Sequence, residues 1–324
     1  MPDVADDNLP MAIGRLQALQ QQMQQVIFGQ VDVIEHLLIT LLCGGHALLE
    51  GVPGTAKTLM VRTLGAAMSC RSKRISFTPD LMPSDILGTN VFDARDNSFH
   101  FHEGPLFTDI LLADEINRAP AKTQSALLEA MSERHATVDG VRYALSPIFA
   151  VFATQNPVEF EGTYPLPEAQ QDRFLLKIKV PYPEDTAEYN LLDAVNRGQP
   201  PDHKPEEAVQ GVLDVPSVQA VQAALPRVRM ETSIVQYVLK IIRATRTHGS
   251  ILVGAGPRGS IYLLQASKAR ALLQGRDYAN PDDVVRMAAP VLAHRMTLAA
   301  EAEVSGATRE QVLQSILETI EVPR

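Results

Sequence analysis

The sequence predicts an α/β protein, with a five-stranded parallel sheet in a core domain and a smaller all-α domain after it. Strand patterns at 46–50, 74–77, 109–115, 149–154 and 174–180 alternate with helical patterns. Alternation of this kind is typical of a parallel sheet covered on both faces. Beyond residue 216 only helical patterns occur, so the second domain is expected to consist of helices.

The composition fits an ordinary soluble α/β protein, because 45% of the 324 residues are hydrophobic and only 5% are aromatic. A net charge of −9 disfavours a dominant role in binding nucleic acid, although a chain with this net charge can still carry a local basic patch. Cysteine occurs only as Cys43 and Cys70, which indicates a reducing compartment without a disulfide framework. An acidic N-terminus and the short apolar run at 37–43 fit neither a signal peptide nor a membrane segment, so we expect a cytoplasmic protein.

The first elements are two helices and a strand. Apolar residues at helical spacing predict an amphipathic helix over 11–26, and a second helix follows at about 31–43 after the turn at Phe28. The strand at 46–50 leads through a glycine-containing loop into a helix that runs from Lys57 to about Ser69.

The next part departs from simple alternation. A short helix is expected at 82–88, and a hairpin is expected where two aromatic-containing stretches flank residues 93–97. A helix at 120–132 precedes a second hairpin at 135–147, which should turn at Asp139 and Gly140, a dipeptide typical of tight hairpins.

Prolines mark a change of organisation after residue 181. We expect a core domain at 1–183, a linker at 184–215 with a helix at about 184–197, and the all-α domain at 216–324. Its helices are predicted at about 217–224, 231–247, 258–274, 281–294 and 308–318, with helix starts at Asn280 and Thr308.

The loop after the first strand is suited to binding polyphosphate. Its glycines let backbone N–H groups face phosphate, Lys57 adds a positive charge near the β/γ oxygens, and the Thr58 hydroxyl can ligate Mg²⁺. Ala56 stands where the strict pattern has glycine, which is acceptable if φ there is negative and unfavourable if it is positive. The alternative is a chance Gly/Pro turn. The predicted binding residues are Gly51, Val52, Pro53, Gly54, Thr55, Ala56, Lys57 and Thr58.

An acidic pair ends the apolar run at 109–115. Ligands of open α/β sheets bind beyond the carboxyl ends of the strands, and the phosphate loop leaves its strand at that same edge. Asp114 can therefore hold Mg²⁺ through water, and Glu115 can orient or deprotonate an attacking water. A helix N-terminus would also favour carboxylates, but it does not explain the strand that precedes them.

Three further polar positions have open alternatives. Asn156 ends the strand at 149–154 and could position water against a γ-phosphate, or could belong to a strand-terminating turn. Arg173 could be a surface charge or a finger that reaches a neighbouring subunit's nucleotide. Arg258 follows Gly256 and Pro257 and could contact phosphate, or could lie in solvent beside a helix-capping turn.

This ordered set of motifs resembles the AAA+ ATPases and, among them, the MoxR family. The resemblance covers about residues 11–320. Its matching segments are 51–58 (Walker A), 111–124 (Walker B and its helix), 153–157 (sensor 1), 165–174 (arginine finger) and 254–258 (sensor 2). Ala56 is usual in that family, so the one departure from the strict motif supports the resemblance.

The resemblance implies roles that the residues alone do not give. ATP and Mg²⁺ would be the cofactors, and Asn156 and Arg258 would be sensors 1 and 2. Arg173 would act in trans, which requires a ring, usually a hexamer. Glu115, Asn156 and Arg173 would be catalytic, Thr58 and Asp114 would serve the metal, and the residues near the adenine would be Ile27, Phe28 and Gly29.

The resemblance also implies a task. Hydrolysis would drive remodelling or activation of a client protein, in the manner of a chaperone and in connection with cofactor or metal-centre assembly. A protein with a von Willebrand factor A domain is the expected partner. The two hairpins would be the helix-2 insert and the pre-sensor-1 hairpin, where a client is expected to dock.

Two other classes stay open at this point. A nucleic-acid motor is one, since related AAA+ proteins with hairpins include helicases, but the charged hairpin residues are balanced rather than basic. A nucleotide-gated scaffold with negligible turnover is the other, and the intact Asp114–Glu115 pair argues against it. A metal site at His100 and His102 is conceivable, yet no third ligand is in view and an ordinary hairpin is favoured.

Overall fold

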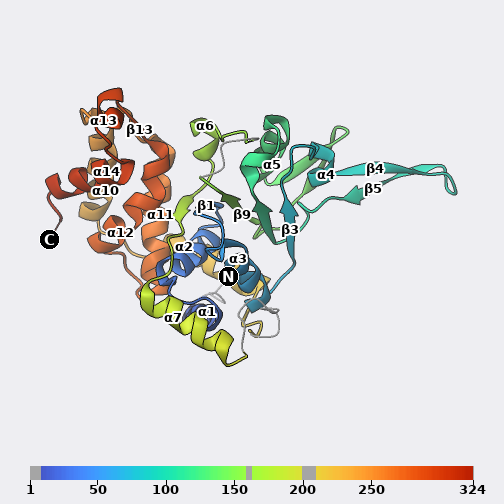
Figure 1. Cartoon of the computed structure of the whole chain (residues 1–324), viewed down its shortest axis with the longest axis horizontal. Coiled ribbons are helices and arrows are strands. Elements are labelled where there is room, and N and C mark those ends of the chain that lie inside the picture. The colour runs from blue at the N-terminus through green and yellow to red at the C-terminus, as the bar shows by residue number, and fades with distance from the viewer. Residues whose placement is uncertain (1–8, 158–162, 199–208, 324) are drawn as a thin grey trace, which may run out of the picture.

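The computed structural model describes residues 9–157, 163–198 and 209–323, and the fold class predicted from the sequence is confirmed (Figure 1). Five parallel strands form one sheet in the order β10-β1-β9-β6-β3. Their bounds are β1 (Ala47–Glu50), β3 (Ser72–Ser76), β6 (Ile110–Asp114), β9 (Ala150–Gln155) and β10 (Leu176–Lys179). The strand predicted at 74–77 is thus β3, shifted towards the N-terminus.

Strand alternation divides the core into two hydrophobic clusters, one on each face of the sheet. Alternate residues of β6 go to opposite clusters: Ile110 and Leu112 to one, Leu111 and Ala113 to the other. The central strands β1, β6 and β9 are therefore apolar almost throughout, as expected of strands buried on both faces.

Helices cover both faces of the sheet. One cluster contains residues from α1 (Leu9–Val26), α2 (Val31–Leu42) and α3 (Lys57–Ala67), and it continues into the C-terminal helices. The opposite cluster contains residues from α4 (Pro83–Leu87) and α5 (Ala121–Glu133).

Strand register gathers the predicted site at one edge of the sheet. Leu49 pairs with Thr154, and Ala113 pairs with Ala153. The residues that follow β1, β6 and β9 therefore leave the sheet side by side at its carboxyl edge, where ligands of such sheets bind.

Both predicted hairpins form. The first consists of β4 (Gly88–Asp93) and β5 (Ser98–Glu103) and projects far from the body of the molecule (Figure 1). The second consists of β7 (His135–Val138) and β8 (Val141–Ala144) and turns at Asp139 and Gly140, which both have positive φ. Phe101 stacks on Tyr143 at 3.9 Å between ring centroids, so the hairpins brace one another near their bases.

The C-terminal part is a helical lid, as predicted, with two additions. Its main helices are α10 (Thr232–Thr247), α11 (Pro257–Leu273), α12 (Pro281–Leu292) and α14 (Arg309–Thr319). Asn280 and Thr308 form capping boxes at the starts of α12 and α14, which confirms both predicted helix starts. The sequence patterns did not predict α13 (Ala300–Val304) or the antiparallel pair of β12 (Ile251–Val253) and β13 (Thr297–Leu298).

The segment between sheet and lid contains α7 (Asp185–Asn196), close to the helix predicted there. The prolines at 200, 201 and 205, which lie in the predicted linker, fall outside the described residues. The short strand β11 (Leu213–Asp214) pairs with β2 (Met68–Ser69), and α9 (Val215–Ala224) packs on α1 and α2. A short helix, α6 (Glu168–Gln171), was not predicted. No helix in the described ranges is both long and apolar enough to span a bilayer.

The burial of the His46 imidazole predicts that the free energy of unfolding depends on pH. His46 is buried at the start of β1, with Nε2 3.1 Å from the Met131 carbonyl oxygen and Nδ1 accepting from Val151 N–H at 3.0 Å. Burial lowers the pKa of His46 to about 3. In the unfolded chain this histidine has an ordinary pKa of about 6.5, so it takes up a proton at a higher pH than in the folded chain. The free energy of unfolding should therefore fall by about 1.4 kcal/mol per pH unit below about pH 6.5.

Urea unfolding at about pH 7.5 and about pH 5.5 measures this loss, which should be about 1.4 kcal/mol for His46 over that interval. Because burial also holds the pKa of His294 well below its ordinary value, the comparison needs a His46→Asn variant. That variant should lose less stability over the same interval than the parent chain. An equal loss in both proteins would show that His46 does not carry the effect.

Candidate nucleotide-binding site

The loop at 51–56 joins β1 to α3 and is shaped by two glycines. A Cβ at Gly51 would lie 2.5 Å from the carbonyl oxygen of Val180, so this position requires glycine. Gly54 has φ +83° and open space where a side chain would project. Lys57 begins α3 and donates from Nζ to the carbonyl oxygens of Gly51 and Val52 at 2.5 and 2.7 Å. The ammonium group therefore lies inside the turn of the loop, where a polyphosphate would be held.

Ala56 adopts the conformation that the sequence reasoning considered unfavourable for it. Its φ is 61° and its ψ is 20°, in the left-handed region, immediately before α3. The sequence left the sign of φ at this position open, and the structure shows the positive, less favourable one. A Cβ makes this conformation costly by about 1–2 kcal/mol, which explains why glycine is usual at this position of the motif.

We predict that Ala56→Gly raises the free energy of unfolding by up to about 1 kcal/mol, because it relieves the left-handed strain and gives back part of the gain as unfolded-state entropy. Urea denaturation measures the change. Ala126→Gly in the interior of α5 is the matched control and should destabilise by about 0.5–1 kcal/mol. Destabilisation by both substitutions would contradict the strain at Ala56.

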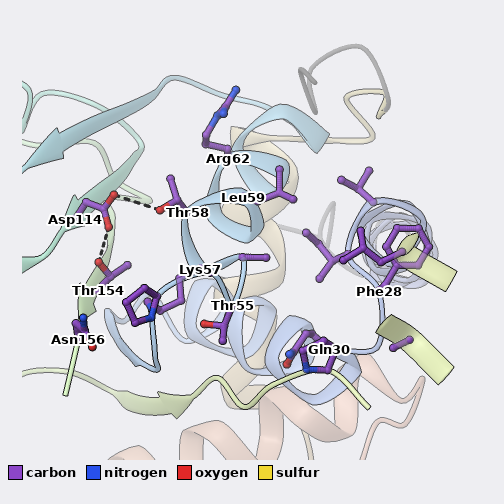
Figure 2. A pocket seen from close by; sticks show the side chains of 18 of the residues that line it. Phe28, Gln30, Thr55, Lys57, Thr58, Leu59, Arg62, Asp114, Thr154 and Asn156 are labelled. Carbon is purple, nitrogen blue, oxygen red and sulfur yellow. Dashed lines mark hydrogen bonds between the residues drawn. The ribbon is translucent and has the colours of Figure 1, made fainter. Parts of the chain in front are cut away.

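Asp114 lies at the centre of a polar network (Figure 2). It is 8% exposed, and its Oδ1 accepts from the Thr154 hydroxyl at 2.5 Å while its Oδ2 accepts from the Thr58 hydroxyl at 3.2 Å. Arg74 also donates to Oδ2, at 2.7 Å from Nη2 and 3.1 Å from Nε. The start of α3, β6 and β9 are thereby joined through one carboxylate, and Arg74 of β3 compensates its charge.

Glu115 has an unusual backbone for a glutamate, with φ 57° and ψ 49°. Its N–H donates to the Thr154 hydroxyl at 2.9 Å, and its Oε2 accepts from Arg118 Nη1 at 2.9 Å. A left-handed non-glycine residue stores about 1–3 kcal/mol of strain, and such residues gather at functional sites. The strain turns the carboxylate out of the sheet, where its side chain is 40% exposed.

These groups line a cavity of about 660 Å³ between the sheet edge, α1 and α7. Its size suits a nucleotide. The predicted residues in its wall are Ile27, Phe28, Pro53, Gly54, Thr55, Ala56, Lys57, Thr58, Asp114, Glu115 and Asn156. Residues that line it without having been predicted as site residues are Val26, Gln30, Leu59, Arg62, Arg74, Thr154, Pro183, Ala187 and Leu191.

Among the residues predicted to bind nucleotide, Gly29, Gly51, Val52 and Arg258 are outside the described lining of this cavity. Gly51 and Val52 nevertheless hold Lys57 through their carbonyl groups. Gly29 has φ +71° and lines a neighbouring cavity, and a Cβ there would lie 2.3 Å from Cβ of Ala187. It therefore lets α7 approach the turn after α1 and close the wall.

The two arginines expected to sense or stabilise phosphate lie away from the cavity. Arg173 donates from Nη1 to the Leu128 carbonyl oxygen at 2.7 Å and to Ser132 Oγ at 2.9 Å, so its side chain lies along α5. Arg258 is the second residue of α11 and forms an ion pair with Asp172 at 2.6 Å. Sequence spacing could not have given either partner, because both contacts join distant parts of the chain.

The donor set fits Mg²⁺ with a nucleoside triphosphate. A hydroxyl (Thr58) and a carboxylate (Asp114) converge within hydrogen-bond distance beside an ammonium group, and Mg²⁺ prefers such oxygen ligands. Burial lowers the pKa of Lys57, and the nearby Asp114 and Glu115 oppose that effect. The cavity can therefore hold a polyphosphate against Lys57 and the loop.

The histidine pair on the first hairpin does not form the metal site that the sequence left conceivable but disfavoured. In the described chain, the group with metal-ligand spacing comprises Asp93, Asp96 and His100, whose ligand atoms lie within 4.8 Å of one another, and His102 is not part of it. His100 Nε2 is already 2.6 Å from Asp96 Oδ2. Exposed clusters of this kind are common without a metal, so we assign no metal role to it.

Comparisons with known proteins agree with this geometry. Residues 46–176 match the model of the ATPase family associated with various cellular activities (AAA), and residues 243–316 match an AAA lid domain. The uncharacterized protein YeaC of Bacillus subtilis is 44% identical over 94% of this chain and 93% of its own. Chaperone MoxR1 of Mycobacterium tuberculosis is 38% identical over 100% of this chain and 86% of its own. A crystal structure of a candidate ATPase from Cytophaga hutchinsonii superposes with a TM-score of 0.89 at 38% identity, covering 99% of this chain and 98% of that one.

Proposed function

This chain belongs to the MoxR family of AAA+ ATPases, and from that premise we propose that it hydrolyses ATP with Mg²⁺ to remodel or activate a client protein. One observation carries the proposal. Lys57 and Thr58 at the start of α3 and Asp114 and Glu115 at the end of β6 meet in one cavity large enough for a nucleotide. A phosphate-binding loop beside an acidic strand end is the arrangement that phosphoryl transfer requires.

Each residue has a role that follows from its position. The loop N–H groups and Lys57 would hold the phosphates, and Thr58 and Asp114 would hold Mg²⁺, which when bound neutralises charge on the phosphate oxygens. Glu115, turned out of the sheet, would orient the attacking water and accept its proton. Asn156 lines the same cavity from the end of β9 and would help to position that water. Ile27 and Phe28 would contact the adenine.

We propose that Arg173 completes the site of a neighbouring subunit in a ring, most simply a hexamer. Its anchorage on α5, outside the cavity of its own subunit, supports action in trans. An arginine finger stabilises charge that develops on the transferred phosphoryl group. Arg258 would contact the nucleotide after a movement of the lid.

The client and the partner are proposed from the family. The first hairpin offers an exposed apolar surface near its tip, where Phe92 and Phe99 are 49% and 70% exposed. We propose that this hairpin contacts the client, that a protein with a von Willebrand factor A domain is the partner, that cofactor or metal-centre assembly is the setting, and that the protein works in the cytoplasm. The acidic and basic residues of the hairpins are mixed, which gives no support to a nucleic-acid motor.

Nucleotide binding by the Lys57→Ala variant tests the proposed function. A charge-assisted hydrogen bond contributes about 1.5–3 kcal/mol, so the affinity for ATP with Mg²⁺ should fall by about 10- to 100-fold. Titration of a fluorescent ATP analogue measures it. Lys240→Ala, at an exposed position of α10, is the matched control and should bind like the parent. Unchanged affinity in Lys57→Ala would show that the loop is not the site.

A further inference from the structure

The segment at 168–174 connects the lid to the arginine proposed to act in trans. Asp172 accepts from two lid arginines: Arg258 Nη1 lies 2.6 Å from its Oδ2, and Arg295 Nε lies 2.9 Å from its Oδ1. Arg295 Nη2 also donates to the backbone carbonyl oxygen of Asp172 at 3.0 Å. Arg173, the next residue, is instead held by α5, through Leu128 and Ser132.

The lid contacts this segment on both sides of Arg173. Before it, Glu168 accepts from the Thr297 hydroxyl and, at 2.8 Å, from Arg309 Nη2. After it, the carbonyl oxygen of Phe174 lies 3.1 Å from Nε2 of His294. These contacts bind α6 and its connection to β10 to the lid. A displacement of the lid would therefore move the segment that carries Arg173.

The two arginines on Asp172 differ in how firmly they are held. The Arg295 side chain is 1% exposed, donates to several carbonyl oxygens and lies over the ring of Tyr262, 4.9 Å from its centroid. The Arg258 side chain is 50% exposed and forms its ion pair with the Asp172 carboxylate. An exposed ion pair contributes only about 0–1 kcal/mol, so Arg258 can leave Asp172 for a phosphate group while Arg295 stays.

We propose that Asp172 is a positioning residue that competes with the bound nucleotide for Arg258 and so couples the lid of each subunit to the Arg173 that it offers to its neighbour. The proposal rests on the proposed function, because it takes Arg173 to act in trans. With no phosphate within reach, Asp172 holds Arg258 against the core. When Arg258 turns to the nucleotide, Arg295 is the one lid arginine that still binds Asp172. The anchorage of the adjacent Arg173 then changes. Coupling of this kind is reciprocal between the two sites.

The Asp172→Asn variant separates this coupling from a merely structural role. It keeps the size of the side chain but removes the charge that competes for Arg258. ATP affinity, measured by titration in the hydrolysis-deficient Glu115→Gln background, should rise by about two- to five-fold, the amount expected from releasing an exposed ion pair. In the parent background, kcat should fall. A merely structural disturbance would lower affinity and kcat together, and that result would overturn the proposal.

A double-mutant cycle assigns the affinity change to the right partner. In an Arg258→Ala background, Asp172→Asn should leave ATP affinity unchanged, because no arginine remains to be released. An equal rise in both backgrounds would overturn the competition. Asp277→Asn, which breaks the exposed lid pair of Asp277 with Arg229, is the matched control and should change neither affinity nor kcat.

Mixed rings test the link to Arg173. Adding Lys57→Ala subunits, which keep Asp172 and Arg173, should restore turnover to Asp172→Asn subunits, because the defect lies in the finger that a subunit offers. If Lys57→Ala rescues Arg173→Ala but not Asp172→Asn, the coupling is wrong while the action in trans stands. If it rescues neither, the proposed action of Arg173 in trans fails, and the coupling fails with it.

Discussion

The Glu115→Gln variant should bind ATP with unchanged affinity and hydrolyse it about 10²- to 10⁴-fold more slowly than the parent, the range of a general-base contribution. The amide keeps the size of the side chain and can still accept from Arg118, which donates to Oε2 at 2.9 Å in the parent. It cannot take a proton from water. The contacts of Lys57, Thr58 and Asp114 are separate from this carboxylate, so binding should persist.

Phosphate release under saturating ATP measures turnover, and titration of a fluorescent analogue measures affinity. Glu301→Gln at an exposed position of α13 makes the same chemical change away from the cavity and should behave like the parent. Turnover undiminished in Glu115→Gln would contradict the role given to this residue. Loss of ATP binding would show instead that Glu115 holds the nucleotide site together.

The same variant offers a route to the client. A subunit that binds ATP without hydrolysing it should remain in its ATP-bound arrangement, and proteins that engage that arrangement should stay with it. Co-purification with Glu115→Gln, compared with Lys57→Ala, which should not reach that arrangement, would then reveal partners that depend on bound nucleotide.

Much of the fold and the centre of the site were predictable because local chemistry decides them. Uninterrupted apolar runs such as that in β6 identify buried parallel strands, and the carboxyl ends of such strands share an edge. That rule alone brings Lys57, Asp114 and Asn156 together, although they are far apart in the sequence. The Asp139–Gly140 turn and the caps at Asn280 and Thr308 were predictable for the same reason, since each is encoded by adjacent residues.

The rest depended on contacts between distant segments. The ion pair of Arg74 with Asp114 arises only because β3 lies beside β6, and strand order is not written in either strand. The cavity wall made by Ala187 and Leu191 required α7 to pack near α1, which the predicted linker gave no reason to expect. The φ of Ala56 could not be read from its identity, because the loop imposes a conformation that alanine disfavours.

A second large effect is expected at Arg173. An arginine finger contributes about 10³- to 10⁵-fold to turnover, so Arg173→Ala should be almost inactive while binding ATP normally. The Arg173 side chain lies along α5, outside the described lining of its own cavity, which is why we propose that it serves the cavity of the next subunit. The guanidinium donates to the Leu128 carbonyl oxygen and to Ser132 Oγ at the surface of α5, so its removal should leave the fold intact.

Mixing inactive variants distinguishes action in trans from action in cis. Arg173→Ala and Lys57→Ala rings should each be inactive, but an equal mixture should regain turnover at interfaces that combine Lys57 of the first variant with Arg173 of the second. Random assembly places that combination at about a quarter of the interfaces of a head-to-tail ring. Mixing Lys57→Ala with Glu115→Gln is the control and should restore nothing, because Lys57 and Glu115 line one cavity and each subunit lacks one of them. Phosphate release from the two mixtures decides between these cases. Equal failure would mean that Arg173 serves its own subunit or that no ring forms. Equal recovery would mean that Lys57 and Glu115 of one working site can come from different subunits, against the cavity that they share in one chain.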